Sequence, residues 1–239
     1  VLNVNKQTPR GYESEGRYVL ELSRYYQGHG DYDTTETMAL QKEAFLRIAH
    51  IVRNQPEVKC ISISGSNAFP NGGGFYGHNF FADTTQAAME KGAYAQWTLN
   101  YAEDGSQFFQ TYGMKDARNG EELVVPPGVA DRGQCFISAE LAKRLFGTVE
   151  VVGKKIFLGG KDISEEIAGV FEDYKHRNYN QPLPLVVRFK KELAATFGFL
   201  EYAIVLRLKE GVDAKAFESR FMKEVAPQLK QGNYYLNKL

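Results

Sequence analysis

Hydrophobic and polar positions at the N-terminal end of the chain follow the order strand, helix, strand. Apolar and polar residues alternate over 17–26, as in a half-buried strand, and apolar residues then recur at near-helical spacing over 38–52. Asp33 and Glu36 have the spacing of a capping box in front of that helix. The apolar-rich run 58–64 predicts a second strand after the helix.

The C-terminal end repeats this order. The run 202–208 predicts a strand, Asp213 is placed to cap a helix over 214–226, and 233–239 predicts a last strand. Two such units with an unlike segment between them predict a split βαβ pair of the ferredoxin-like kind. Right-handed crossovers would place the four strands in one sheet with both helices on the same face.

The middle of the chain predicts a short helix followed by a β-hairpin. Ser138 is a good N-cap for a helix over 138–146, and Gly147 stands where a helix needs a left-handed stop. Two apolar-rich runs, 154–158 and 163–171, then flank a Gly-Gly-Lys-Asp turn signal. Helix and hairpin are expected to share one small core, formed by Leu141, Leu145, Phe146, Ile156, Leu158, Ile167 and Val170.

Three short motifs in this middle segment carry a family resemblance. They are Leu-Ala, a basic pair and Leu-Phe-Gly at 141–147, Val-Gly-Lys-Lys-Ile at 152–156, and Ile-Ala-Gly-Val-Phe-Glu-Asp at 167–173. Their order and spacing resemble the extracytoplasmic core domain of MacB/FtsX-type ABC transporter permeases. The loop 117–120 departs from the family, which usually has Gly-Arg there, whereas this chain has Ala-Arg-Asn-Gly.

The resemblance implies an α+β fold in two parts. Residues 1–92 and 197–239 would form a porter-like split βαβ subdomain, and residues 93–196 an inserted, small β-rich subdomain of the kind called Sabre. In this family the domain hangs between the first and second transmembrane helices of the permease, in the periplasm. Both ends of the chain would then lie together and face the membrane.

The same resemblance implies which partners the domain has. They are the permease's own transmembrane helices, a cytoplasmic ATPase subunit or domain, a permease dimer mate and an extracytoplasmic partner protein. Nucleic acid is not expected, because 29 Lys and Arg balance 29 Asp and Glu and leave no cationic excess. The chain has neither a signal peptide nor an apolar run of membrane-spanning length, which is expected of a segment excised from a longer protein.

No group of residues predicts catalysis, a metal site or a cofactor site. Of the four histidines, only His29 has carboxylates close by, and a solvated loop explains that arrangement better than a metal site. The glycines at 72–74 lack the Gly-Lys-Ser/Thr ending of a phosphate-binding loop, so the ATPase must be another chain or domain. Cys60 and Cys135 could form a disulfide, but their apolar neighbours favour two buried thiols.

An aromatic run is the one candidate interaction surface. Exposed, Phe75, Tyr76, Phe80 and Phe81 would suit a partner or a lipid-like cargo, but burial is favoured because large apolar side chains prefer interiors. The leading hypothesis is a non-catalytic permease domain that transmits ATP-driven conformational change to a partner or cargo outside the membrane. The alternative is a free-standing extracytoplasmic binding protein for a small or lipid-like ligand, and a hydrolase is a distant third.

Overall fold

Four strands from the two ends of the chain form one sheet. The computed structural model describes residues 11–23, 35–65, 76–101, 107–159, 163–175, 182–191, 202–225 and 233–238. The four strands are β1 (Arg17–Ser23), β2 (Val58–Gly65), β9 (Tyr202–Leu208) and β10 (Asn233–Lys238). Their order is β10-β1-β9-β2, with antiparallel neighbours throughout. This is the fourth-first-third-second order of a ferredoxin-like split βαβ pair, so the predicted topology is confirmed. We call these four strands the split sheet.

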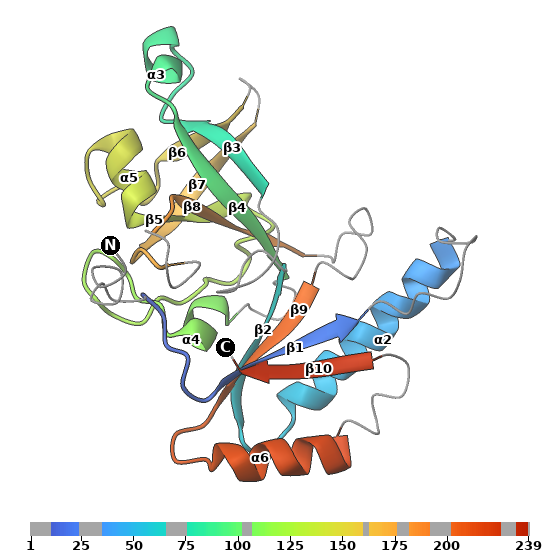
Figure 1. Ribbon diagram of the computed structural model, residues 1–239. Helices are drawn as coiled ribbons and strands as arrows, with labels where there is room; N and C mark the ends of the chain where they lie inside the picture. Colours follow the sequence, from blue (N-terminus) through green and yellow to red (C-terminus); the bar gives the residue numbers. More distant parts are fainter. Residues whose placement is uncertain are drawn as a thin grey trace, which may run out of the picture.

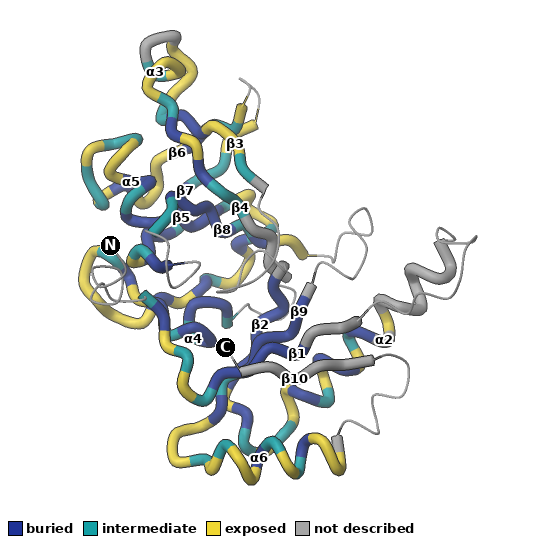
Figure 2. Tube along the Cα trace, in the orientation of Figure 1, coloured by how far each residue is buried: buried dark blue, intermediate teal, exposed yellow. Residues whose placement is uncertain are grey.

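Both predicted helices pack on one face of the split sheet. Helix α2 (Thr35–Arg53) follows β1, and α6 (Ala214–Arg220) follows β9 (Figure 1). One buried core joins this face of the sheet to the two helices, and it includes Tyr18, Leu20, Ile61, Ile63, Ile204 and Leu206 from the strands and Phe45, Val52 and Phe217 from the helices. The expectation that the two helices share a face is confirmed. Figure 2 shows the buried stretches of α2 and α6 turned toward the strands.

The start of α6 matches the sequence prediction and its end does not. The Asp213 carboxylate accepts hydrogen bonds from the backbone amides of Lys215 (2.9 Å) and Ala216 (3.2 Å), as an N-cap does. The α-helix ends at Arg220 and continues as a single π-turn, Phe221–Val225, where one α-helix had been expected up to 226. Phe217 and Phe221 are both buried in the core, with ring centroids 5.6 Å apart. The predicted capping box before α2 lies outside the described residues at Asp33.

The other six described strands form a closed ring. They are β3 (Tyr76–Phe81), β4 (Ala93–Tyr101), β5 (Gln134–Ser138), β6 (Lys155–Leu158), β7 (Ser164–Phe171) and β8 (Leu185–Lys190). Their order is β4-β3-β6-β7-β5-β8, and a parallel pairing of β8 with β4 closes it. The ring joins the split sheet where Ser64 of β2 pairs with Asn100 of β4. We call this part the ring.

Strand β3 pairs with strands of the ring. Residues up to 92 had been assigned to the split sheet, but β3 pairs with β4 and β6 of the ring. Phe80 opposes Leu158, and the short helix α3 (Gln86–Glu90) connects β3 to β4. Residues 76–92 therefore lie with the ring. The Phe80 side chain has its apolar partners there, which the local sequence pattern did not reveal.

Helix α5 (Ala139–Phe146) and the β6–β7 hairpin share the predicted core. The Ser138 hydroxyl accepts from the Leu141 amide (3.3 Å), and Gly147 adopts a φ of 74° at the other end of the helix. Leu141, Ile156, Ile167 and Val170 are all buried in one cluster, and Leu145, Phe146 and Leu158 pack against it. Leu145 is only partly buried, so Leu141 and not Leu145 is the centre of this core.

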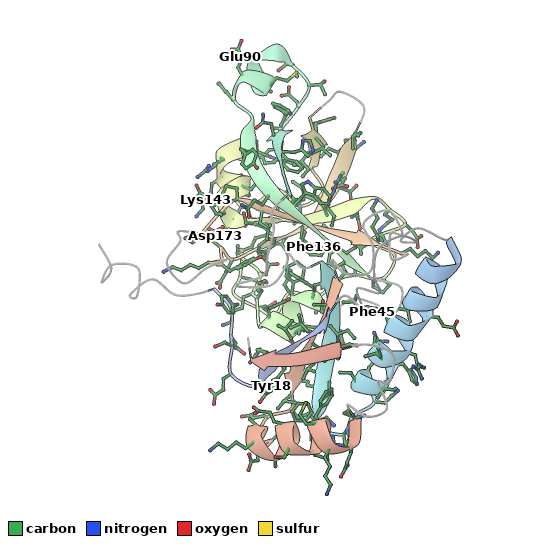
Figure 3. All side chains as sticks on the ribbon, turned by 45° about the vertical axis from the view of Figure 1, so that its right-hand side comes forward. Tyr18, Phe45, Glu90, Phe136, Lys143 and Asp173 are labelled. Atoms are coloured by element: carbon green, nitrogen blue, oxygen red, sulfur yellow. The ribbon has the colours of Figure 1, made fainter. Side chains whose placement is uncertain are left out.

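A third core lies between the split sheet and the ring. Its centre is α4 (Phe108–Tyr112), a one-turn helix whose Phe108, Phe109 and Tyr112 are fully buried. From the split sheet it receives Val19, Ala203 and Val205, which lie on the face opposite α2 and α6, and from the ring it receives Phe136, Phe171, Leu185, Val187 and Phe189. Figure 3 shows Phe136 between Tyr18 of the split sheet and Glu90 at the far tip of the ring. The two parts are therefore joined by a continuous apolar core.

Two further observations bear on the sequence predictions. Cys60 and Cys135 are free and buried, as the interpretation in terms of buried thiols expects. Among the described residues, no helix is both long and apolar enough to cross a membrane.

Candidate functional site

The described ends of the chain leave the split sheet side by side. Tyr18 lies opposite Lys238 in the antiparallel ladder between β1 and β10. The first strand therefore begins where the last strand ends, at one end of the sheet (Figure 1).

The segment just before β1 lies against both parts of the molecule. We call residues 11–16 the strap. Gly11 adopts a φ of 74° and lies so close to Asp173 that a Cβ would overlap its carbonyl oxygen. The buried Tyr12 ring packs edge-on against Tyr174, and the Glu13 amide donates to the carbonyl of Tyr112 (2.9 Å). The strap thus connects the end of β7, the helix α4 and the start of β1.

Two arginines of the split sheet hold the C-terminal end of α4. Arg17 Nε donates to the Thr111 carbonyl (3.0 Å), and Arg207 Nη1 donates to the Gln110 carbonyl (2.8 Å). The last carbonyls of a helix have no partner within the helix and carry partial negative charge, so guanidinium groups stabilise them. The short helix is therefore fixed to the split sheet by charged hydrogen bonds as well as by apolar packing.

The Glu13 carboxylate of the strap lies between these two arginines. It forms an ion pair with Arg17, whose side chain is only 5% exposed, and lies 3.6 Å from Arg207 Nη2. Burial and the neighbouring Arg207 lower the pKa of Arg17, while Glu13 raises it. Two adjacent cations in a half-buried place need an anion between them, and the strap supplies one.

A groove of about 710 Å³ opens beside this cluster. One wall is the strap with the start of β1, and the other is the turn that leads from β9 to α6. Arg17, Arg207, Lys59 and Lys209 are the basic residues that line it. Glu13, Glu15 and Glu210 also line it, so both signs of charge are present.

The strand β2 presents small polar side chains to α4. Ser62 and Ser64 are buried and hydrogen-bonded to each other (2.8 Å), and the Thr111 hydroxyl donates to Cys60 Sγ (3.5 Å). Burial raises the pKa of the Cys60 thiol, which therefore stays protonated at neutral pH. The face of β2 that meets α4 thus carries small hydroxyl and thiol groups, whereas the face that meets α2 and α6 carries large apolar side chains.

The structure separates the members of the predicted aromatic surface. Phe80 and Phe81 are buried, at 1% and 9% exposure, as the interpretation in terms of core packing expects. Phe75 and the side chain of Tyr76 lie outside the described residues. Of the histidines, His50 and His78 are exposed, whereas His29 and His176 are not among the described residues. In the part of the chain that the structure describes, no three His, Cys, Asp or Glu residues are close enough to hold a metal ion.

Sequence reasoning missed the charged cluster at the groove. Glu13 lies in a polar segment before the first predicted strand, and Arg17 and Arg207 are polar positions in strands predicted from their apolar residues. Arg17 and Arg207 are 190 positions apart in the numbering, and each bonds to a carbonyl of α4 more than ninety positions from itself. The only local signal was the pair of glycines that bounds the strap, Gly11 and Gly16, both of which adopt positive φ.

With this geometry known, comparison with protein families decides the identity of the domain. The family model described as the MacB-like periplasmic core domain matches residues 81–223, which include the whole ring except the first strand and reach into the last helix. The chain belongs to this family. The match confirms the resemblance carried by the motifs of α5 and the β6–β7 hairpin. No curated protein sequence matches the chain.

Solved structures with the same fold cover nearly all of this MacB-like domain. The periplasmic region of MacB from Actinobacillus actinomycetemcomitans is 9% identical, with a TM-score of 0.57 over 98% of this chain and 94% of that one. A domain of a putative permease protein from Porphyromonas gingivalis is 16% identical, with a TM-score of 0.55 over 97% and 92%. The extracellular domain of the noncanonic ABC-type transporter YknZ from Gram-positive bacteria is 13% identical, with a TM-score of 0.52 over 92% and 98%.

The family membership places this MacB-like domain outside the cytoplasm, as a domain of an ABC transporter permease. Membership in such a permease implies transmembrane helices and an ATPase elsewhere in the transporter.

Proposed function

We propose that this MacB-like domain is a non-catalytic transmitter of movement. Conformational change driven by ATP in the cytoplasm would reach it through the permease's transmembrane helices and pass to a partner or cargo outside the membrane. One observation carries the proposal: the strap before β1 contacts the split sheet, α4 and the ring at once. A displacement of the entering chain would therefore act on both parts of the domain.

The contacts of the strap differ in how easily they can change. Tyr12 and Tyr174 meet through ring packing, which tolerates small shifts. Arg17 and Arg207 make directional hydrogen bonds to α4, which fix the helix to the split sheet. We infer that a pull on the strap moves the ring relative to the split sheet, with α4 as the pivot.

We also propose a division of the chain that differs from the one expected from sequence. The split sheet would comprise residues up to 65 and from 202 onward, and the ring would comprise 76–191. The pairing of β3 with β4 and β6 supports this division. The two crossings would then lie within 66–75 and 192–201.

The proposal names two partners beyond the transporter's own chain. A permease dimer mate and an extracytoplasmic partner protein are the components against which the domain would act. Phe75 and Tyr76 remain candidate contacts for such a partner. Phe80 and Phe81 are buried and therefore do not belong to the aromatic interaction surface that the sequence suggested. That loss also weakens the alternative of a free-standing binding protein, which depended on all four side chains.

A distance measurement in the full-length permease tests the proposal. Spin labels would be attached to cysteines at Glu90, on α3, and at Lys215, on α6, both of which are exposed. The two native thiols are buried, so they should not take up label. A matched pair at Glu90 and Lys143 lies wholly within the ring. With the ATPase trapped in an ATP-bound state, the Glu90–Lys215 distance should change and the Glu90–Lys143 distance should not.

The outcomes separate transmission from other roles. If both distances stay constant through the ATP cycle, the domain does not transmit movement between its two parts. If both change, the ring itself deforms, and the proposal that the split sheet and the ring move as two bodies is wrong. Tyr12→Ala should reduce the change in the Glu90–Lys215 distance, because it removes the contact between strap and ring.

A further inference from the structure

The groove beside the strap has the features of an anion-binding site. The Glu13 carboxylate of the same chain occupies the position of the anion. Arg17 and Arg207 are held in place from behind, because each donates to a carbonyl of α4. Arg17 Nη1 donates to the Glu15 carbonyl (2.5 Å), and Nη2 of each arginine lies close to the Glu13 carboxylate. Glu13 is 53% exposed, while the side chains of Arg17 and Arg207 are 5% and 22% exposed. The cations are therefore preorganised, and the anion between them is the exposed, replaceable member.

The walls of the groove add cations that the fold does not use for packing. Lys59 is exposed and has no ion pair or hydrogen bond among the described residues. Lys209 is also exposed; its ammonium group donates to the Pro56 carbonyl (2.5 Å) and interacts electrostatically with Glu57. Guanidinium and ammonium groups that line one groove favour a phosphate group, whose oxygens accept several such bonds at once.

The position of the groove indicates where such an anion would come from. The groove lies at the start of β1 and the end of β9, at the same end of the sheet where Tyr18 faces Lys238. In a domain attached to transmembrane helices at both ends, this end of the sheet is the one nearest the membrane. A volume of about 710 Å³ is large for a single ion and suits a headgroup.

We propose that this groove binds a phosphate-bearing anion, a phospholipid headgroup or a free phosphate, between Arg207, Lys59 and Lys209, and that Glu13 is its built-in competitor. That the anion is a phospholipid headgroup of the membrane rests on the proposed function, whereas the anion site itself does not. Binding would displace the Glu13 carboxylate from Arg207 and loosen the strap, while the Glu13 amide keeps its bond to Tyr112. The site would thereby couple the headgroups under the domain to the segment that enters it.

Vesicle binding and phosphate titration of the 239-residue chain test the proposal. One arm uses phosphatidylglycerol vesicles in a flotation assay at low salt, and the other follows inorganic phosphate and glycerol phosphate by calorimetry. Arg207→Gln should weaken binding at least about tenfold, since it removes a charged hydrogen-bond donor. Arg144→Gln on α5, an exposed arginine of the ring, is the control with the same change in net charge.

Glu13→Gln gives the opposite test. Removal of the competing carboxylate should strengthen binding several-fold, whereas Glu90→Gln at the ring tip, which changes net charge equally, should leave it nearly unchanged. Thermal melts would show whether each variant folds. If Arg207→Gln does not fold, Lys59→Gln replaces it, because the exposed Lys59 has no structural contact among the described residues.

Each result has one meaning. Binding to vesicles with these variant effects supports the headgroup as the source, and binding to soluble phosphate alone supports a free phosphate. Equal losses for Arg207→Gln and Arg144→Gln, or no gain for Glu13→Gln, would overturn the site in favour of diffuse attraction. Failure of both probes to bind would also overturn it. None of these results depends on the ATP-driven distance change, so the two proposals fail separately.

Discussion

The rings of Tyr12 and Tyr174 meet edge to face, with centroids 6.3 Å apart and an interplanar angle of 87°. This contact joins the strap, just before the first strand, to the segment that follows the last strand of the β6–β7 hairpin. The ring centroid of Tyr174 lies 6.4 Å from that of Phe171. Because Tyr12, Tyr174 and Phe171 belong to the same core cluster, the strap packs against the core between the two parts. Burial raises the pKa of Tyr174, which keeps its hydroxyl neutral in the folded protein.

Tyr12→Ala should destabilise the domain by about 2–4 kcal/mol, because it removes a buried ring and leaves a cavity at the junction. Tyr12→Phe keeps the ring packing and should cost much less. Chemical denaturation of the two variants measures the difference. Equal losses for both variants would show that the hydroxyl, and not the ring, is the stabilising group.

Leu141→Ala should cost about 2–5 kcal/mol, since Leu141 is fully buried in the core shared by α5 and the hairpin. Leu145→Ala, one turn later on the same helix face, should cost clearly less, because Leu145 is only partly buried. Equilibrium unfolding of the two variants provides the comparison. A larger loss for Leu145→Ala would mean that the centre of this core is misplaced.

Hydrogen exchange on the Leu141→Ala variant tests whether the ring opens independently. We expect protection to fall mainly within 76–191, because local openings follow cooperative units of the structure. The amides of β1 and β2 should keep their protection. An equal loss in those strands would mean that the core around α4 makes the split sheet and the ring a single cooperative unit.

Ser138→Ala should destabilise the ring by about 1–3 kcal/mol. The buried Ser138 hydroxyl accepts from two amides, that of Leu141 (3.3 Å) at the start of α5 and that of Leu185 (3.0 Å) at the start of β8. Thr85→Ala is the matched control. It removes an N-cap bond at the exposed end of α3, to the Ala88 amide, and should cost under about 1 kcal/mol. Similar losses in thermal melts would contradict the dual role of Ser138.

Asp173→Asn should stabilise the domain near neutral pH. Burial raises the pKa of Asp173 above its ordinary value of 3.8, an effect to which Glu140 adds and which the Glu140 amide, Lys143 and Arg144 oppose. A carboxyl whose pKa is higher in the folded state binds more protons there, so its contribution to stability falls as pH rises through that window. An asparagine can still accept from the Glu140 amide (2.8 Å in the native domain) but does not ionise.

The gain from Asp173→Asn should therefore depend on pH in a defined way. It should be small below pH 3.8, grow as pH rises toward the folded pKa of Asp173, and stay constant above that value. Asp116→Asn should show the reverse trend. The Arg118 side chain lowers the pKa of Asp116, so this variant should lose stability at neutral pH and approach the native domain in acid. A pH-independent difference for Asp173→Asn would contradict the assignment.

The sequence by itself determined the local elements whose signals lie within a few residues. The caps of α5 at Ser138 and Gly147 and the cap of α6 at Asp213 appear where side-chain chemistry predicted them. Strand–helix–strand at both ends was enough to predict the order of the split sheet, because crossover handedness leaves few ways to join such units. The motifs around α5 and the hairpin identified the family, which the comparison confirmed.

Only the tertiary structure decided how the middle of the chain is arranged and where its charged cluster lies. The parallel pairing of β8 with β4 closes the ring, and β3 joins the ring although it follows the first strand–helix–strand unit. Alternation of apolar and polar residues predicts that a strand has one buried face, but it does not predict which strand lies beside it. Likewise, Arg17 and Arg207 acquire their role from carbonyls of α4, which are distant in sequence and come within reach only when the helix packs against the sheet.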